Sequence, residues 1–136
     1  MKKLFIGLIL WGLIFAASGC NTSTVAIERP REAVTLADGS TVVAYMTGEN
    51  ATYYLFGFIP FFTTNPNRPN TRDYEFFSDR LSEIRNADML TKFAKRLEAD
   101  RAVDIQHKRE SYGAWSLWIV NPVFITSTAT AVKDPK

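Results

Sequence analysis

The residues of this chain that could do chemistry are few, and two of them are single copies of their type. Cys20 is the only cysteine and His107 the only histidine among 136 residues. Nucleophilic catalysis needs a nucleophile beside a base, and histidine is the side chain whose ordinary pKa lies nearest neutrality. Ser111 and Ser116 are the serines closest to His107 in the sequence, but neither belongs to a nucleophile-elbow motif. A structural or surface histidine is therefore favoured, and a hydrolase using His107 is the minor alternative.

Metal, acid–base and phosphate sites have little support in the residue pattern. A zinc site takes three or four Cys, His or carboxylate ligands, and one histidine does not anchor such a set. Glu75, Asp79 and Glu83 have helical spacing, but Arg80 and Arg85 lie among them, which is typical of a solvated charged face. The seven glycines are scattered and form no phosphate-binding loop. We therefore expect no metal, no cofactor and no catalytic residue.

Cys20 is the residue with the clearest chemical context. Three features precede it in order. Lys2 and Lys3 come first, an uncharged stretch follows over residues 4–17 (LFIGLILWGLIFAA), and small residues then lead to Gly19. This order is typical of a secretory signal peptide, and the apolar run is shorter than the roughly 20 residues of a membrane-spanning helix. The polar residues 21–24 offer Cys20 no core in which to lie as a small apolar side chain. The sequence therefore predicts export.

The stretch Ala17-Ser18-Gly19-Cys20 resembles the lipobox of bacterial lipoprotein precursors. In that class small residues lead into a cysteine whose sulfur receives a thioether-linked diacylglycerol, and the signal peptide is cut immediately before it. The resemblance implies cleavage between Gly19 and Cys20 and a covalent lipid on Cys20, although Ala17 stands where leucine is most typical. It covers about the first 20 residues only, so it indicates a small envelope lipoprotein without naming a specific family.

The residue after the cysteine carries a further implication of the same resemblance. In lipoproteins of double-membraned bacteria, aspartate at that position favours retention in the inner membrane, and this chain has Asn21. The resemblance thus implies a cell-envelope location on the outer membrane, facing the periplasm. In a bacterium with a single membrane, the same anchor places the domain outside the cell.

The charge balance of the mature chain limits its partners. Removal of the signal peptide 1–19 leaves 117 of the 136 residues and takes away Lys2 and Lys3, so 14 basic residues face 14 acidic ones. A neutral domain lacks the basic surface that nucleic acids require. The expected partners are the membrane, through the lipid, and an envelope protein or an apolar ligand.

One domain is expected after the anchor. Residues 20–32 are predicted to form the lipidated N-terminus and a flexible tether, because polar residues precede mixed charges around Pro30. Residues 33–136 are predicted to form a single α+β domain, a small antiparallel or mixed sheet of about five strands with one amphipathic helix packed on it. Asn86 is the predicted N-cap of that helix. Its apolar stripe is Leu90, Phe93, Ala94 and Leu97.

The strands are predicted from turn signals. Asp38-Gly39 indicates a hairpin between residues 33–36 and 41–46, and residues 48–50 a second turn. A third strand from Thr52 is expected to end at Pro60, because proline cannot donate to an interior ladder. The remaining strands are expected over residues 103–108, 115–120 and 123–132, with a break at 121–122.

Aromatic residues concentrate between positions 53 and 62 of the chain. Core packing is the simplest explanation, since strands favour aromatic side chains. The alternative is an exposed apolar tip beyond Pro60, which would bind a membrane, a lipid or another apolar ligand. The candidate contact residues are Phe58, Phe61, Phe62, Trp115 and Trp118. The leading hypothesis is therefore a lipid-anchored, non-enzymatic envelope protein with a binding or structural role, and the alternative is an apolar-ligand or lipid-binding module.

Overall fold

A computed structural model describes residues 23–112 and 119–135, which form six strands and one helix. All strand pairs are antiparallel, and the path across the sheet is β4-β3-β2-β6-β5, with β1 also paired to β2. The predicted α+β class is confirmed, with six strands instead of about five. In chain order the elements are β1 (Thr24–Glu28), β2 (Thr41–Leu55), β3 (Ile59–Thr64), β4 (Tyr74–Phe76), α2 (Glu83–Arg96), β5 (Arg101–Ser111) and β6 (Val120–Lys133).

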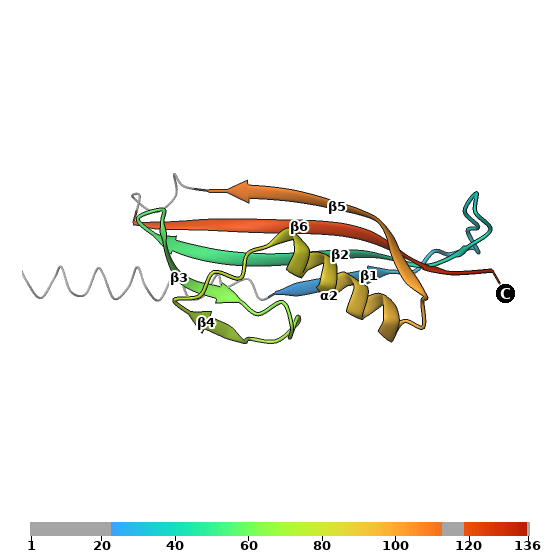
Figure 1. Ribbon diagram of the computed structural model, residues 1–136, viewed down its shortest axis with the longest axis horizontal. Helices are drawn as coiled ribbons and strands as arrows, with labels where there is room; N and C mark the ends of the chain where they lie inside the picture. Colours follow the sequence, from blue (N-terminus) through green and yellow to red (C-terminus); the bar gives the residue numbers. More distant parts are fainter. Residues whose placement is uncertain (1–22, 113–118, 136) are drawn as a thin grey trace, which may run out of the picture.

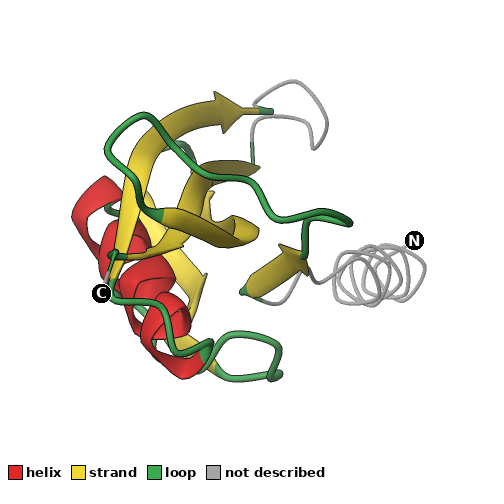
Figure 2. Ribbon diagram, turned by 90° about the vertical axis from the view of Figure 1, so that its right-hand side faces the viewer, coloured by secondary structure: helices red, strands yellow, loops and turns green. Residues whose placement is uncertain are grey.

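The helix α2 packs against one face of this sheet, where it contacts β2, β5 and β6. Figure 1 shows α2 in front of the long strands, and Figure 2 shows the curved sheet end-on with the helix on one side. The predicted apolar stripe makes this contact, because Leu90 and Ala94 are buried while Phe93 and Leu97 pack at the margin. The core is built mainly from small and medium side chains: Val25, Ala44, Met46, Met89, Leu90, Ala94, Ala99, Ala129 and Ala131.

The start of the helix differs from the prediction. Ser82 is the N-cap residue and Glu83 the first helical residue, so Asn86 is not the cap. Asn86 lies inside the helix with only 1% of its surface exposed. Its side-chain amide faces β2 and β6 and has hydrogen-bond partners on both strands. A polar residue that looks like a cap in the sequence is thus part of the buried face.

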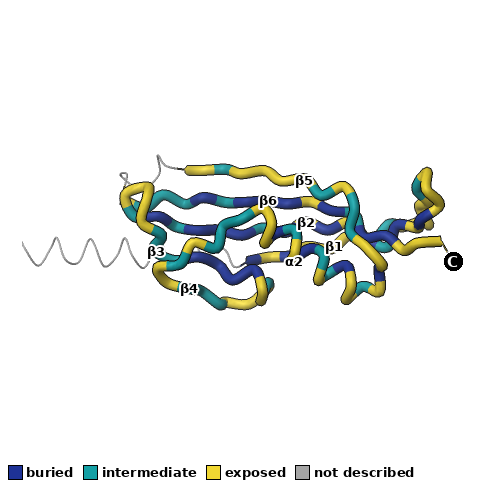
Figure 3. The backbone as a smooth tube through the Cα atoms, in the orientation of Figure 1, coloured by how far each residue is buried: buried dark blue, intermediate teal, exposed yellow. Residues whose placement is uncertain are grey.

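Strand β2 is one continuous element of 15 residues, so the turn predicted at residues 48–50 is wrong. The predicted hairpin is reduced to a single bridge between Thr35 and Thr41. Along its length β2 pairs with β6, and its other edge is shared by β1 and β3. Buried and less buried residues alternate along β2 and β6 (Figure 3), as expected for strands with one face on the core.

Within the described residues, the folded body already includes Ser23 and the strand after it, although it was predicted to start at residue 33. Thr24–Glu28 forms β1, so a flexible tether over residues 20–32 is wrong for this part. Ser23 is 1% exposed and Val25 joins the core. Asn70 binds the outer edge of β1. Its side-chain Oδ1 accepts from the backbone N–H of Val25 at 3.0 Å, and its backbone N–H donates to the Ser23 carbonyl at 2.6 Å. These bonds replace the strand neighbour that β1 lacks on that side.

Both prolines predicted to interrupt strands lie within them. Pro60 belongs to β3 and stands opposite Tyr54, next to a shift in the β2–β3 register between Tyr53 and Tyr54. Pro122 belongs to β6, which is continuous from Val120, so the predicted break there is wrong. An irregular register at Pro60 agrees with the tendency of proline to occur at bulges.

Gly48 allows the close approach of α2 to the sheet. A Cβ atom built on Gly48 would lie 2.6 Å from Cε of Met89 and 3.1 Å from Cδ2 of Leu90. The first contact could be relieved by rotation of the flexible methionine, but the second involves a fully buried leucine. Glycine at this position of β2 therefore sets the helix-to-sheet distance.

We expect Gly48→Val to lower the free energy of unfolding by about 1–3 kcal/mol, the usual range for overpacking a core. The measurement is urea unfolding of the detergent-solubilised protein followed by circular dichroism. Thr47→Val is the matched control, because Thr47 is the exposed neighbour on β2 and is already β-branched. Equal stability of the two variants would contradict the close packing of α2 on Gly48.

Candidate functional site

His107 is part of a hydrogen-bonded chain of side chains that crosses the sheet beneath α2. Its Nδ1 lies 2.7 Å from Oγ of Ser127, which accepts from Nδ2 of Asn86 at 2.9 Å. Asn86 in turn accepts from the side-chain amide of Asn50, and Asn50 accepts from the hydroxyl of Ser23. The chain joins β5, β6, α2, β2 and the residue before β1, and all its members except His107 are buried. We call these five residues the polar chain.

The polar chain does not resemble a catalytic triad. Ser127 is fully buried, so no substrate reaches its hydroxyl. Ser111 lies four residues from His107 on β5, about 13 Å away at the usual strand rise, and Ser116 is outside the described residues. No buried side-chain nitrogen or oxygen in the described part of the chain lacks a hydrogen-bond partner. The polar chain therefore acts as a set of mutually satisfied buried groups, which favours one register of helix on sheet.

The carboxylates predicted to be surface groups are engaged in local contacts. Glu75 forms an ion pair with Arg80 at 2.6 Å. Asp79 accepts a hydrogen bond from the hydroxyl of Tyr54 at 2.9 Å. The pKa of Tyr54 is raised to about 12, mainly by burial and in second place by this bond. Among residues 23–112 and 119–135, no three His, Cys, Asp or Glu side chains are grouped so that they could hold a metal ion.

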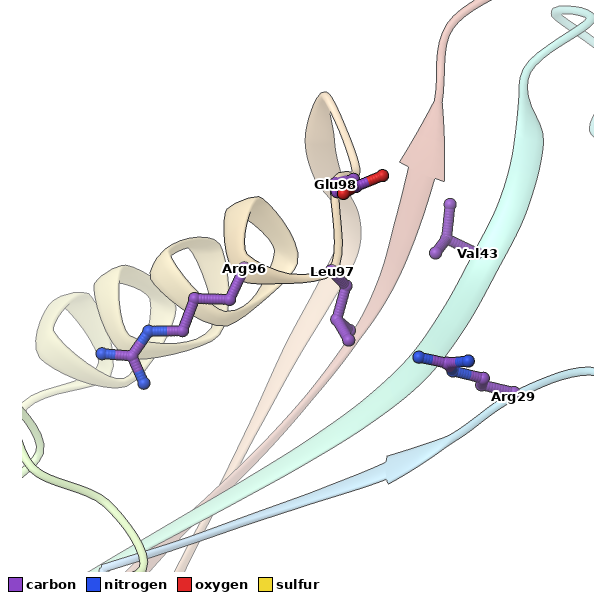
Figure 4. A pocket seen from close by; sticks show the side chains of 5 residues that line it. All are labelled: Arg29, Val43, Arg96, Leu97 and Glu98. Atoms are coloured by element: carbon purple, nitrogen blue, oxygen red, sulfur yellow. The ribbon is translucent and has the colours of Figure 1, made fainter.

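A surface pocket beside the end of α2 is the next candidate. It is lined by Arg29, Val43, Arg96, Leu97 and Glu98. Figure 4 shows Arg96 extending along the helix, away from Arg29, and its guanidinium lies 4.9 Å from the centre of the Phe93 ring. The two arginines thus do not converge on one point, and Glu98 adds a negative charge. This arrangement is a poor anion site.

Aromatic side chains form a continuous row across the other face of the sheet. Tyr53 stacks on Phe62 with ring centres 4.2 Å apart, and its edge contact with Phe124 spans 6.3 Å. Tyr74 extends the row beyond Phe62 at 5.9 Å, and Tyr112 extends it beyond Phe124 at 5.6 Å. Strand alternation places Tyr53 on the face opposite Gly48, which contacts the helix. The row supports the end of the sheet where β2 meets β3.

The strongest concentration of exposed apolar surface lies at that end. Phe56 and Phe58 flank Gly57 in the turn between β2 and β3 and are 61% and 72% exposed. Phe76 and Phe77, at the end of β4, are 64% and 71% exposed. Phe61 lies three residues after Phe58 in the chain, and its ring centre is 6.1 Å from each of the rings of Phe76 and Phe77. We call these five residues the aromatic end.

The predicted contact residues fall into three groups. Phe58 is exposed in the turn, before Pro60 and not beyond it. Phe61 and Phe62 are only partly exposed, because neighbouring rings cover part of them, so the more exposed phenylalanines at this end are others. Trp115 and Trp118 lie outside the described residues, as do Gly19 and Cys20.

The sequence reasoning missed Phe56, Phe76 and Phe77. Phe56 was expected in a strand interior, but it has a left-handed backbone (φ 53°) and turns outward. Phe76-Phe77 follows Glu75 in an apolar pair whose second member also has φ 53°. Positive φ at a phenylalanine is not readable from a single sequence, because glycine, asparagine and aspartate are the usual residues there.

The helix of the described region, α2, is neither long nor apolar enough to cross a membrane. Comparison with known proteins gives no relative: no protein-family model, no curated protein and no solved structure matches this chain.

Proposed function

We propose that this chain is a lipid-anchored protein of the bacterial cell envelope, held through acyl chains on Cys20, and that its α+β domain acts by binding or structural association instead of catalysis. The order of Lys2 and Lys3, the apolar stretch, Ser18-Gly19 and Cys20 supports the anchor. The neighbouring Asn21 supports the outer membrane as its location.

The observation that carries most of the proposal is the burial of Ser23. Cys20 lies only three residues before this 1% exposed residue, and three extended residues span about 10 Å. An anchor on Cys20 would therefore hold the domain directly against the bilayer, not on a long tether. A folded body that includes a residue so near the anchoring cysteine is suited to act at the membrane surface.

The two other function classes differ in how much support they have. A hydrolase using His107 is disfavoured because the hydroxyl bonded to its ring belongs to buried Ser127. An apolar-ligand or lipid-binding role for residues 53–62 has support in the aromatic end, which presents exposed phenylalanines at the molecular surface.

The anchor can be tested on the protein purified from membranes. Cys20 is the only cysteine, so a thioether at its sulfur leaves no thiol in the mature chain. We expect the denatured protein to react with no maleimide, and mass spectrometry to give an N-terminal peptide that begins at Cys20 and carries a diacylglycerol. One reactive thiol per chain, or a peptide that still contains Gly19, would contradict the proposal.

A further inference from the structure

We propose that the aromatic end is a second membrane contact: Phe56 and Phe58 in the β2–β3 turn, together with Phe76 and Phe77 at the end of β4, insert into the headgroup zone of the same bilayer that holds Cys20. This inference rests on the proposed function, because the position of the anchor is the reason for choosing the bilayer as the surface that covers the exposed phenylalanines. It also names what the domain does once anchored, which is to adopt a fixed orientation on the bilayer surface.

The first support is the degree and manner of exposure. Phe56, Phe58, Phe76 and Phe77 each expose 61–72% of their surface although the sheet offers an interior nearby. Phe56 and Phe77 are held in left-handed backbone conformations that bulky residues rarely adopt. An apolar patch that a fold presents in this way is typical of a contact with a partner or a bilayer.

The second support is the charge distribution. Residues 50–67, which contain the whole β2–β3 turn, include no Asp, Glu, Lys or Arg. Near β4, the charge of Glu75 is matched by Arg80 at 2.6 Å. An uncharged turn with exposed phenylalanines suits the boundary between headgroups and acyl chains, where interfacial segments bury Phe, Leu and Trp side chains. It does not provide the basic cluster that would recognise anionic headgroups.

The third support is the geometry of the anchor relative to the aromatic end. β1 is antiparallel to β2, and Thr24 stands opposite Glu49, so the chain enters β1 from the side on which β2 ends at Leu55. Leu55 lies six residues beyond Glu49, about 20 Å further along the strand. Figure 1 shows the β2–β3 turn at the end of the molecule toward which β2 points.

These distances set how deep the aromatic end can reach. Three residues allow Cys20 to extend about 10 Å from Ser23 toward that end. With Cys20 at the membrane surface and fully extended from Ser23, the Phe56–Phe58 turn lies about 10 Å deeper, at the upper end of the 5–10 Å burial depth usual for interfacial apolar groups. A second copy of the chain could also cover the exposed phenylalanines, but it would not account for their distance from Cys20.

The test uses one introduced cysteine at a time in the mature, lipid-modified protein, in which the sulfur of Cys20 is not free to react. Phe58→Cys introduces a thiol at the aromatic end, and Ala37→Cys introduces one in the exposed loop before β2, at the opposite end of that strand. Each variant is labelled with an environment-sensitive fluorophore and placed in vesicles of phosphatidylethanolamine with phosphatidylglycerol as the minor lipid. Nitroxide-bearing lipids in the same vesicles quench fluorophores that enter the bilayer.

We expect the label at position 58 to be quenched several-fold more than the label at position 37, with its emission shifted to the blue. Quenching should persist at about 1 M salt, because screening does not weaken an apolar contact. Adding Phe56→Ser should reduce the quenching at position 58. Tyr45→Ser is the matched control, since Tyr45 is an exposed aromatic residue elsewhere on β2, and it should change nothing.

Equal quenching at positions 58 and 37 would overturn the inference, and so would quenching that disappears at high salt. A disulfide between two unlabelled Phe58→Cys chains, without lipid quenching, would overturn it in favour of a second copy. Failure of the anchor is read separately from the same preparations, because an unmodified Cys20 would give two labels per chain instead of one.

Discussion

Replacing Cys20 by serine is expected to reduce the incorporation of labelled fatty acid into this protein to background. The proposed lipid would be attached through a thioether, and serine has no sulfur with which to form one. The chain offers no second cysteine as a substitute. Each buried methylene contributes about 0.8 kcal/mol to membrane affinity, so loss of two or three acyl chains removes almost all of the anchoring free energy.

The measurement is growth with a clickable fatty acid, followed by purification and in-gel detection. Thr22→Ser is the matched control, because it makes a similarly small change two residues away and should leave the label unchanged. The Cys20→Ser protein should also keep residues 1–19, since removal of the signal peptide in lipoproteins follows lipid attachment. Equal labelling of Cys20→Ser and the unaltered chain would rule out the anchor.

Asn86→Ala is expected to lower the free energy of unfolding by about 2–4 kcal/mol, the largest effect on stability that we predict. Asn86 donates to the Ile125 carbonyl at 3.0 Å and to Ser127 Oγ at 2.9 Å, and it accepts from Asn50. Alanine would leave the buried amide of Asn50 with only the weakly accepting sulfur of Met89 at 3.9 Å, and an unsatisfied buried polar group costs about 1–3 kcal/mol. Loss of the side-chain volume adds to this penalty.

Urea unfolding of the detergent-solubilised protein provides the measurement. Asp88→Ala is the control, because Asp88 is exposed on the same helix and its replacement should change stability by no more than about 0.5 kcal/mol. If Asn86→Ala and Asp88→Ala are equally stable, the polar chain contributes nothing to the fold. A loss confined to Asn86→Ala would identify it as the connection between α2 and the two central strands.

Much of the fold could be predicted from periodicity. The spacing of Leu90, Phe93, Ala94 and Leu97 predicted the helix and its buried side, and alternation predicted most of the strand segments. The boundaries were less accurate. Asn86 looked like a cap because asparagine is common there, whereas its burial depends on Asn50 and Ser127, which lie 36 and 41 residues away. Local preference cannot reveal partners at such separations.

The errors around Gly48 and β1 have the same origin. Gly48-Glu49-Asn50 reads as a turn because glycine and asparagine favour turns. In the structure the lack of a side chain on Gly48 serves the approach of α2, and the strand continues through it. The segment 24–28 reads as a tether because it has only five residues and lies among polar neighbours. In the structure it pairs with residues 45–49.

By itself, the sequence determined the place of the single thiol, the uncharged run before it, the charge balance of the remainder and the α+β class. These depend on composition and local order, which a linear reading contains. Only the tertiary structure decided that Ser23 is buried in the folded body, that Asn86 and His107 belong to one polar chain, and that Phe56, Phe58, Phe76 and Phe77 are exposed. Those properties depend on which distant strands pair and on which backbone conformations the turns adopt. Neither is encoded by residue type at a single position.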